Sequence, residues 1–449
     1  MTVAVDEMDP TPRGARPSPG SLPADAEEDS PAGAFRSLGV RNFRLFFTGQ
    51  LISQVGNWLT LVAQTLLVLK LTDSGVALGL LAAAQFGPVL LFGAFAGLVA
   101  DRSDKRRLLL WIQTFAMFQS FALAALAFMG RPPLLAIYGV AVLGGFATAF
   151  DNPTRRSFVV EIVPKQDITN AVSLNSALMT GARVVGPALA GLLVTTVGFG
   201  WAFALDGVSY LAVLAGLLLM NPAEIHRAPR AERGKGQVRE GIRYVRTIPD
   251  LWVPLVMMAI VGTLAFNFQT VVPLFATRDL GGTDVTFTLL MSVVSIGSLA
   301  GALWAARRTV ITIAMVSWSA LAFGVAMGLF AVAPGQPIAF AFALLVGLSS
   351  ITFMTTSTAI VQIRANPTMR GRVLALQAIV FLGSTPIGGP IVGLICQQFG
   401  ARYGLALGAL GALGAGVWGL LFVRRSQVDA PRASGSGDPR LALAATSRG

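Results

Sequence analysis

Three charged side chains stand inside long apolar segments of the sequence: Asp151, Arg183 and Asp206. A charge in hydrocarbon is costly, so such residues pair with one another or mark a path for ions or substrate. Asp151 lies in the second half of one predicted helix and Arg183 about 16 residues into the next, which runs antiparallel, and an arginine side chain can span the remaining difference in depth. We predict an intramembrane Asp151–Arg183 pair that is either structural or part of proton coupling; the alternative is that the two never meet.

Asp206 lies near the start of its own predicted helix. It is either an acid at the membrane interface or a coupling residue. The chain has a single histidine, His226, which lies outside the apolar segments. If transport is coupled to protons, the coupling must therefore involve Asp151, Asp206 or Glu161.

The composition excludes most other chemistry. Only 12% of the 449 residues are charged and 54% are hydrophobic, whereas soluble domains carry about 25% charged residues. The solvent of this chain is therefore lipid. One cysteine, Cys396, permits no intrachain disulfide, and one histidine permits no multi-histidine metal site. The sequence contains no G-x-x-x-x-G-K-S/T, G-x-S-x-G or H-E-x-x-H motif, so we expect no ATP-driven pump, no enzyme, no metal and no cofactor.

Twelve segments are apolar over the roughly 20 residues that a membrane-spanning helix needs. The loops between them are short, apart from a polar, basic linker in the middle of the chain. The predicted helices are 43–69, 75–100, 108–130, 134–160, 167–197, 201–220, 249–277, 284–306, 310–332, 337–363, 371–398 and 402–423.

Lys and Arg are distributed unevenly between the two sets of loops. With the N-terminus inside, 29 of the 34 basic residues fall on the cytoplasmic side, four fall outside, and the remaining one is Arg183. Basic residues are enriched in cytoplasmic loops, so we predict a multi-pass cell-membrane protein with both termini in the cytoplasm. The net charge of +12 then reflects loops that face anionic lipid, not a nucleic-acid surface.

Small residues recur at a nearly constant offset between the two parts of the chain. Gly93 and Gly97 recur as Gly297 and Gly301, and Gly186-Pro187 recurs as Gly389-Pro390. Two similar parts around a central site are typical of secondary transporters. We therefore predict an all-α polytopic membrane protein with two pseudo-symmetric six-helix bundles. The predicted division is a disordered cytoplasmic tail at 1–37, bundles at 38–220 and 249–424, a cytoplasmic linker at 221–248 and a disordered cytoplasmic tail at 425–449.

Two motifs resemble those of the major facilitator superfamily. "GLVADRSDKRR", from Gly97 to Arg107, resembles the signature loop between helices 2 and 3, with Asp104 where a second glycine is usual. "GARVVGPALAG" resembles the helix 5 motif associated with antiporters, with the upstream glycine displaced by one residue. The stretches "FRLFFTGQLISQVGNW", "FDNPTRRSFVVEIVPKQDITNAVSLNSAL" and "MRGRVLAL" resemble the branch of enterobactin and macrolide exporters. The helix 5 motif contains Gly181, Gly186, Pro187 and Gly191.

The resemblance implies a conformational latch in the signature loop. Helix 11 of the other bundle would be the neighbour of Gly97, and its positive N-terminal end near Gly371 would face the Asp101 carboxylate. Such a latch would stabilise only the outward-open state. The alternative is that the loop is an ordinary positive anchor. We expect Glu161 to extend the network towards Arg102 or Arg106.

Polar side chains of the first predicted helix share one face. Gln50, Gln54, Asn57, Thr60 and Gln64 follow one another at spacings of four, three, three and four residues. This face should avoid lipid and either form bonds between helices or line a substrate cavity. The hydroxyl-rich stretch 349–358 is interpreted as packing. The predicted cavity residues are Gln50, Gln54, Asn57, Trp58, Gln64, Gln85, Gln113 and Asn267.

These features together favour a secondary active transporter that works by alternating access. By resemblance, we expect an exporter of a small amphipathic compound, such as a siderophore, a macrolide or another drug-like molecule. Proton-coupled antiport, a role in antibiotic resistance and a monomeric state follow from the same resemblance. One alternative is an importer or facilitator on the same fold. Another is a non-transporting membrane sensor, although such a protein would need neither a duplicated bundle nor a polar interior stripe.

Overall fold

The computed structural model describes residues 33, 35–226, 237–306 and 311–429. Most of the two predicted tails and residues 227–236 of the linker lie outside this part of the chain. Within it, all regular structure is helical, and twelve helices are long and apolar enough to cross a membrane. The predicted fold class and the number of spanning segments are confirmed.

Six membrane helices precede the linker and six follow it. The first six form the N-terminal bundle: α2 (Arg41–Thr72), α3 (Gly75–Arg102), α4 (Lys105–Phe128), α5 (Leu134–Glu161), α6 (Ile168–Thr196) and α7 (Phe199–Leu219). The C-terminal bundle begins with α9 (Pro249–Leu264), α10 (Phe268–Leu274) and a π-helical turn at Phe275–Asp279. It continues with α11 (Asp284–Ala306), α12 (Ile313–Ala331), α13 (Gln336–Arg364), α14 (Pro367–Phe399) and α15 (Ala401–Asp429).

Local sequence explains where the helices end. Ser74 and Asp104 cap the N-termini of α3 and α4, each accepting a backbone N–H three residues further on, which satisfies a donor that the helix leaves free. Between α2 and α3, Asp73 adopts a left-handed conformation with φ 41°, and between α6 and α7, Gly198 has φ 86°. These residues reverse the chain within a few positions and keep neighbouring helices antiparallel.

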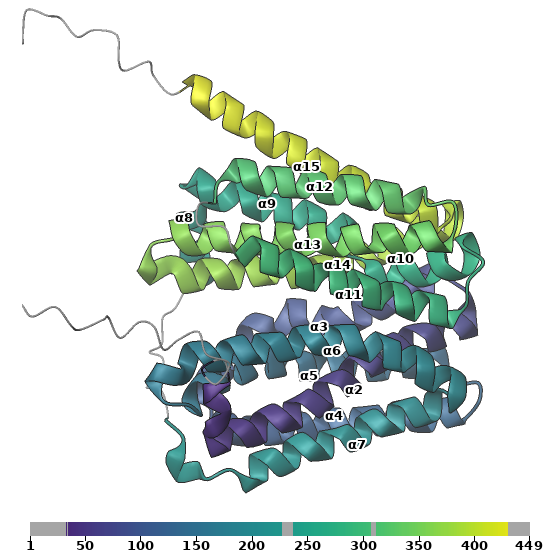
Figure 1. The fold of residues 1–449 in the computed structure, drawn as a ribbon, viewed down its shortest axis with the longest axis vertical. Helices are drawn as coiled ribbons and strands as arrows, with labels where there is room; N and C mark the ends of the chain where they lie inside the picture. The colour runs from purple at the N-terminus through teal and green to yellow at the C-terminus, as the bar shows by residue number, and fades with distance from the viewer. Residues whose placement is uncertain (1–32, 34, 227–236, 307–310, 430–449) are drawn as a thin grey trace, which may run out of the picture.

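The two bundles pack against each other along two helix pairs. Helix α3 of the N-terminal bundle contacts α14, and α6 contacts α11. Figure 1 shows the two groups of helices one above the other, with α8 (Gln237–Arg246) of the linker at the left end of the helices. We call this the linker end, and the opposite end, which holds Asp73 and Arg278, the far end.

The close contacts between the bundles are concentrated towards the far end. Glycines of α3 and α14 meet there, with Gly75 against Gly393 and Gly79 against Gly389. The Gln397 side chain accepts the Gly75 N–H at 2.8 Å. At the linker end, by contrast, a side chain added at Gly97 or at Gly371 would meet open space. The bundles therefore close at the far end and separate towards the linker end.

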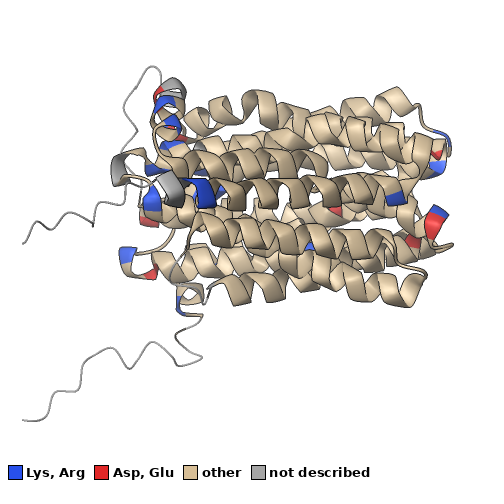
Figure 2. Cartoon of the chain, turned by 90° about the horizontal axis from the view of Figure 1, so that it is seen from above, with Lys and Arg blue, Asp and Glu red and all other residues tan. Residues whose placement is uncertain are grey.

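Charge follows the same division into two ends. Figure 2 shows the acidic and basic residues gathered at the ends of the helices, with most of the basic ones at the linker end. A short helix of the linker, α8 (Gln237–Arg246), packs on α14 and α9. It is tied there by an Arg372–Glu240 ion pair of 2.7 Å and by the Asn366 N–H, which donates to the Tyr244 hydroxyl at 3.0 Å. The sequence did not predict α8.

The seventh membrane segment is interrupted rather than continuous. The prediction of a single helix over 249–277 is wrong in this respect, because α9 ends at Leu264 and α10 starts only at Phe268. Interrupted helices are tolerated within membranes where they border a site or are buried in protein. The Asn267 side chain at this break is buried, and its amide donates to the Thr263 carbonyl at 2.7 Å.

Candidate functional site

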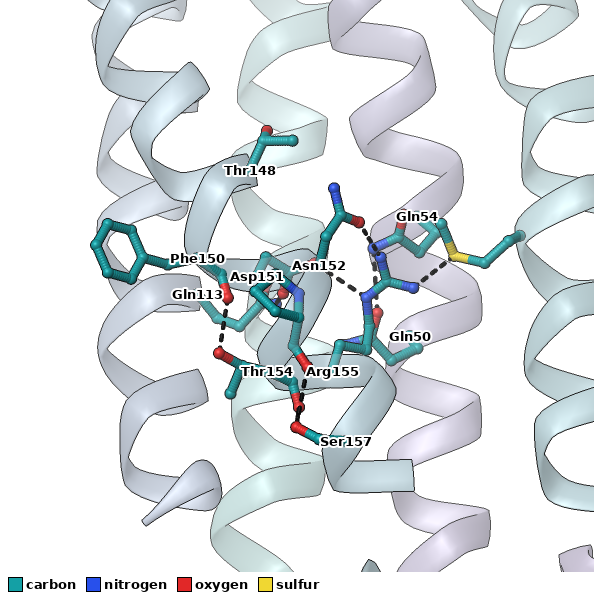
Figure 3. Close-up of polar contacts among 12 residues, drawn as sticks. Gln50, Gln54, Gln113, Thr148, Phe150, Asp151, Asn152, Thr154, Arg155 and Ser157 are labelled. Atoms are coloured by element: carbon teal, nitrogen blue, oxygen red, sulfur yellow. Dashed lines mark hydrogen bonds and ion pairs between the residues drawn. The ribbon is translucent and has the colours of Figure 1, made fainter. Parts of the chain in front are cut away.

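An acid–base network lies inside the N-terminal bundle (Figure 3). The Asp151 carboxylate accepts from Arg155 Nε at 2.9 Å and from Gln113 of α4 at 2.8 Å. Arg155 also donates to the side chain of Asn152 at 2.9 Å and contacts the Met179 sulfur on α6. The Arg155 side chain is only 4% exposed and that of Asp151 14% exposed. The charges of Asp151 and Arg155 thus neutralise each other among three helices.

The predicted Asp151–Arg183 pair is wrong. Asp151 and Arg155 are four residues apart on α5, so their side chains meet on one helical face without any contribution from another helix. Sequence reasoning counted Arg155 among the basic loop residues and missed its role. The signal was present in "FDNPTRR", where an acid precedes an arginine by four residues within a predicted helix.

Arg183 instead lies over an aromatic ring. Its guanidinium carbon is 5.2 Å from the centre of the Trp58 ring on α2, a distance at which a cation is attracted to the ring face. The Arg183 side chain is exposed, Trp58 is half-buried, and the neighbouring Asn57 is exposed. Of the predicted polar stripe of α2, Asn57 is the member that remains open to the space beside the helix.

Asp206 is enclosed by hydroxyl groups. Its carboxylate accepts from Thr60 and from Ser120, each at 2.7 Å, and its main-chain carbonyl accepts from Ser209 at 2.7 Å. The residue is 1% exposed and sits between α2, α4 and α7. Asp206 thus lies inside the bundle, and its position relative to the membrane interface stays a prediction. Gly56 makes room for it, since a side chain at that position would overlap the carboxylate.

Most of the amides predicted to line a cavity are buried between helices instead. Gln54 donates to Gln50 at 3.1 Å, and Gln85 of α3 donates to Gln64 at 2.9 Å, which joins α2 to α3. Amides in a membrane bundle can satisfy one another, although Gln50 Nε2 and Asn267 Oδ1 are buried here without a hydrogen-bond partner. The cavity prediction is therefore wrong for the following buried residues in this conformation: Gln50, Gln54, Gln64, Gln85, Gln113 and Asn267.

The C-terminal bundle presents hydroxyls and rings in place of charges. The hydroxyls of the 349–358 stretch bond to carbonyls of their own helix, as in Thr352 to Leu348 at 2.6 Å and Thr358 to Met354 at 2.8 Å. These bonds support the interpretation of the stretch as packing, which stays a prediction. Beside the interruption of the seventh segment, Phe266 contacts the rings of Phe268 and Phe381 at 5.9 and 5.2 Å.

Comparison with known proteins places this arrangement in a family. A family model described as transmembrane secretion effectors matches residues 32–446. The chain belongs to this family of major facilitator superfamily transporters. It is 24% identical over 361 residues to the staphyloferrin A transporter of Staphylococcus aureus, covering 80% of this chain and 90% of that protein. It is 25% identical over 409 residues to the multidrug efflux pump Tap of Mycolicibacterium fortuitum, covering 86% and 96%.

Further relatives and solved structures agree with this assignment. The macrolide efflux protein A of Streptococcus pyogenes is 21% identical over 378 residues, which cover 80% of this chain and 91% of that protein. Among solved structures, the peptide transporter POT has a TM-score of 0.71 at 14% identity, over 86% of this chain and 94% of that one. The chain therefore has the transporter fold of the superfamily, and transporters, not enzymes, are its relatives.

The signature loop of this transporter is not engaged with the other bundle in this conformation. Asp101 is exposed, and Gly97 and Gly371 face open space rather than each other. Glu161 pairs with Lys105 at 2.5 Å, and both side chains are buried. We predicted Arg102 or Arg106 as the partner of Glu161. Lys105 takes this place because it begins α4 where α5 ends, and Arg106 instead donates to the Leu217 carbonyl at 2.7 Å.

The helix 5 motif joins α6 to two neighbours. Gly186 lies directly against the Trp58 side chain of α2, and Gly191 against Thr288 of α11 in the other bundle. Pro187 is buried, whereas Gly181 faces open space. The motif thus contributes both to a contact within the N-terminal bundle and to the seam between bundles.

No metal centre is found in the part of the chain that the structure describes, since no three His, Cys, Asp or Glu residues gather there in a way that could hold an ion. What the described residues offer is a charged network, an open cation on an aromatic ring and a buried carboxylate among hydroxyls. These groups can bind polar parts of a solute and can take up or release a proton.

Proposed function

We propose that the chain exports a small amphipathic compound in exchange for protons, by alternating access across the cell membrane. The linker end carries most basic residues, so the rule that such residues face the cytoplasm favours an inside location for this end and for both termini. With that orientation, contacts at the far end close the outer side, and the conformation is inward-open. The names of the relatives, which transport a siderophore, a macrolide or several drugs, support export of a compound of this kind.

The amphipathic character of the substrate is supported by unlike chemistry in the two bundles. The N-terminal bundle supplies Asn57, Trp58 and the Arg183 guanidinium. The C-terminal bundle supplies the half-buried rings of Phe266, Phe268 and Phe381. A compound with one polar and one apolar part satisfies both kinds of surface.

The observation that carries proton coupling is the Asp151–Arg155 pair. An ionised Asp151 accepts from Arg155 and Gln113, whereas a protonated Asp151 would lose its charge and leave Arg155 as an uncompensated buried cation. One proton would therefore change the contacts among α4, α5 and α6. Asp151 is partly exposed, whereas Asp206 is fully enclosed, so Asp151 is the more accessible of the two acids.

The test is transport by the purified protein in liposomes with an imposed pH gradient. The substrates are staphyloferrin A and erythromycin, chosen because relatives are named for a siderophore and for macrolides. We expect gradient-driven accumulation in vesicles oriented inside-out, and its loss when nigericin collapses the gradient. Asp151→Asn should reduce the gradient-driven part at least about tenfold. Asp284→Asn, which removes an acid at the far end of α11, is the control and should transport normally.

Three results would contradict the proposal. Wild-type accumulation that persists with nigericin would exclude proton antiport. Accumulation only in right-side-out vesicles would favour an importer on the same fold. Gradient-driven transport by Asp151→Asn equal to that of Asp284→Asn would remove Asp151 from coupling.

A further inference from the structure

Arg183 stands on a face of α6 that lies between two neighbouring helices. Gly186 contacts α2 and Gly191 contacts α11. At 3.6 residues per turn, Gly186 is rotated about the helix axis by about 60° to one side of Arg183, and Gly191 by about 80° to the other side. Arg183 therefore points between α2 of its own bundle and α11 of the opposite bundle. Its side chain is exposed on the face of α6 that adjoins the seam between the bundles.

The acids of the described residues do not neutralise Arg183. Asp151 is bound by Arg155 and Gln113, and Asp206 is surrounded by hydroxyls. In the C-terminal bundle, the acids within the described span 249–425 are Asp250, Asp279 and Asp284, which all lie at helix ends. The neighbour that contacts the Arg183 guanidinium is the Trp58 ring.

Trp58 holds the guanidinium in a way that suits an anion. A ring on one face of an arginine stabilises the cation without using any of its N–H groups. The planar fork of donors then stays free for a carboxylate or a similar group, which it binds by two parallel hydrogen bonds. Asn57 is exposed on the same turn of α2 and supplies an amide within the same region. Arg155 differs, because its own bundle already fills its donor positions.

We infer that Arg183 and Trp58 form the recognition site for an anionic group of the substrate, most simply a carboxylate. The inference rests on the proposed function, since it names the substrate class for the same central space. The apolar part of the compound would then face the C-terminal bundle. Arg183 is a binding residue in this view, and Trp58 is a positioning residue that orients it.

The test is equilibrium binding to the full-length protein in lipid nanodiscs, without any gradient. The probes are dansylglycine, which carries a carboxylate, and dansylglycinamide, which is the same fluorophore without the charge; empty nanodiscs give the background. The wild-type protein should bind the carboxylate at least about tenfold more tightly than the amide, as one charge-assisted contact allows. Arg183→Gln should remove this preference, and Arg183→Lys should keep only part of it, because lysine retains the charge but not the planar fork of donors. Arg44→Gln removes an exposed cation at the linker end of α2 and should leave the preference unchanged.

Because binding is measured without a gradient, this test is independent of direction and coupling. A wild-type protein that does not prefer the carboxylate overturns the inference even if transport is proton-coupled. The same holds if Arg183→Gln keeps the preference. The wild-type comparison of the two probes stands by itself, so the inference remains testable even if Arg183→Gln does not fold. Trp58→Leu should weaken carboxylate binding about threefold or more while leaving amide binding unchanged, and an equal loss for both probes would argue against orientation of Arg183 by the ring.

Discussion

The two bundles share a backbone plan but differ in chemistry. The N-terminal bundle holds charges far from the helix ends, at Asp151, Arg155, Arg183 and Asp206. Gly186-Pro187 and Gly389-Pro390 set an offset of 203 residues between the two bundles. At this offset, Asp151, Arg155 and Arg183 correspond to Met354, Thr358 and Pro386 of the C-terminal bundle. Its described acids lie at helix ends. Among the described residues, the duplicated fold thus concentrates the charges within its helices in one bundle, while the other has apolar and hydroxyl side chains at the corresponding places.

Glycines show the opposite asymmetry. Gly297, Gly301 and Gly347 bring α11 and α13 into direct backbone contact, through the carbonyls of Leu344, Leu348 and Val294. Gly93 and Gly97, the repeat counterparts of Gly297 and Gly301, meet no other helix, whereas Gly144, the counterpart of Gly347, lies near Gln119 of α4. Close packing of small residues is a main source of stability between membrane helices. The N-terminal bundle has backbone contacts of this kind at other glycines, such as Gly145 and Gly216, so the contrast concerns these repeated positions and not the two bundles as wholes.

The largest expected effect comes from breaking the side-chain pair. Arg155→Met should lower the stability of the purified protein by about 3–5 kcal/mol, because it leaves the Asp151 carboxylate without its cationic partner. Thermal unfolding in detergent would measure the loss. The matched control is Thr352→Val in the C-terminal bundle, which should cost less than about 1 kcal/mol because that hydroxyl bonds to its own helix. Equal losses in the two variants would show that the bundles do not differ in this way.

The second prediction compares two glycines of the repeat. Gly347→Ala should destabilise the protein by about 1–3 kcal/mol, because its new methyl group would overlap the Val294 carbonyl and force α11 and α13 apart. Gly97→Ala meets open space in this conformation and should change thermal stability by less than about 0.5 kcal/mol. A larger loss for Gly97→Ala than for Gly347→Ala would contradict the assignment of close packing to the Gly347 position.

The sequence predicts the fold better than it predicts the site, for a physical reason. Twelve spans follow from apolar length alone, and the repeat follows from glycines whose spacing is visible in one dimension. The predicted helix 134–160 already contained Asp151 and Arg155, but the count of basic residues by loop assigned Arg155 to the cytoplasmic side, so their pairing four residues apart on one helix was overlooked. The burial of Gln64 and Gln85 depended on how closely α2 and α3 pack, which no single-helix pattern contains. Likewise, α9 ends at Leu264 without any proline or glycine at the break itself.

The third prediction concerns the signature loop, which is open in this conformation. If Asp101 meets the N-terminal end of α14 when the linker end closes, Asp101→Asn should slow transport about two- to fivefold, the equivalent of roughly 0.3–1 kcal/mol. Membrane insertion should be unchanged, because the basic residues of the loop remain. Asp104→Asn in the same loop is the control, since asparagine caps a helix about as well as aspartate and the α4 cap should persist. Transport by Asp101→Asn equal to that of Asp104→Asn would leave the loop as an anchor only.

The smallest effect should come from the far end, where Arg278 bridges the bundles by donating to the side chain of Asp73 at 3.2 Å and to its main-chain carbonyl. The pair is exposed, with 76% of the Asp73 side chain accessible, so it stabilises the closed far end by only about 0.2–1 kcal/mol. Arg278→Gln should therefore shift the population towards closure of the linker end by up to about fivefold. Spin labels at Gln166→Cys and Ile363→Cys, on a Cys396→Ala background, would report this as a larger fraction of short distances.

The control for this measurement is Arg131→Gln. Arg131 is also an exposed arginine near the far end, but it lies in the loop between α4 and α5 of a single bundle. Its replacement removes the same charge without breaking a bridge, so the distance distribution should not change. If Arg278→Gln and Arg131→Gln gave the same distribution, the glycine contacts of α3 and α14 would be sufficient to hold the far end closed. At the seam between the bundles, close backbone contact would then stabilise the closed far end more than the Arg278–Asp73 pair does.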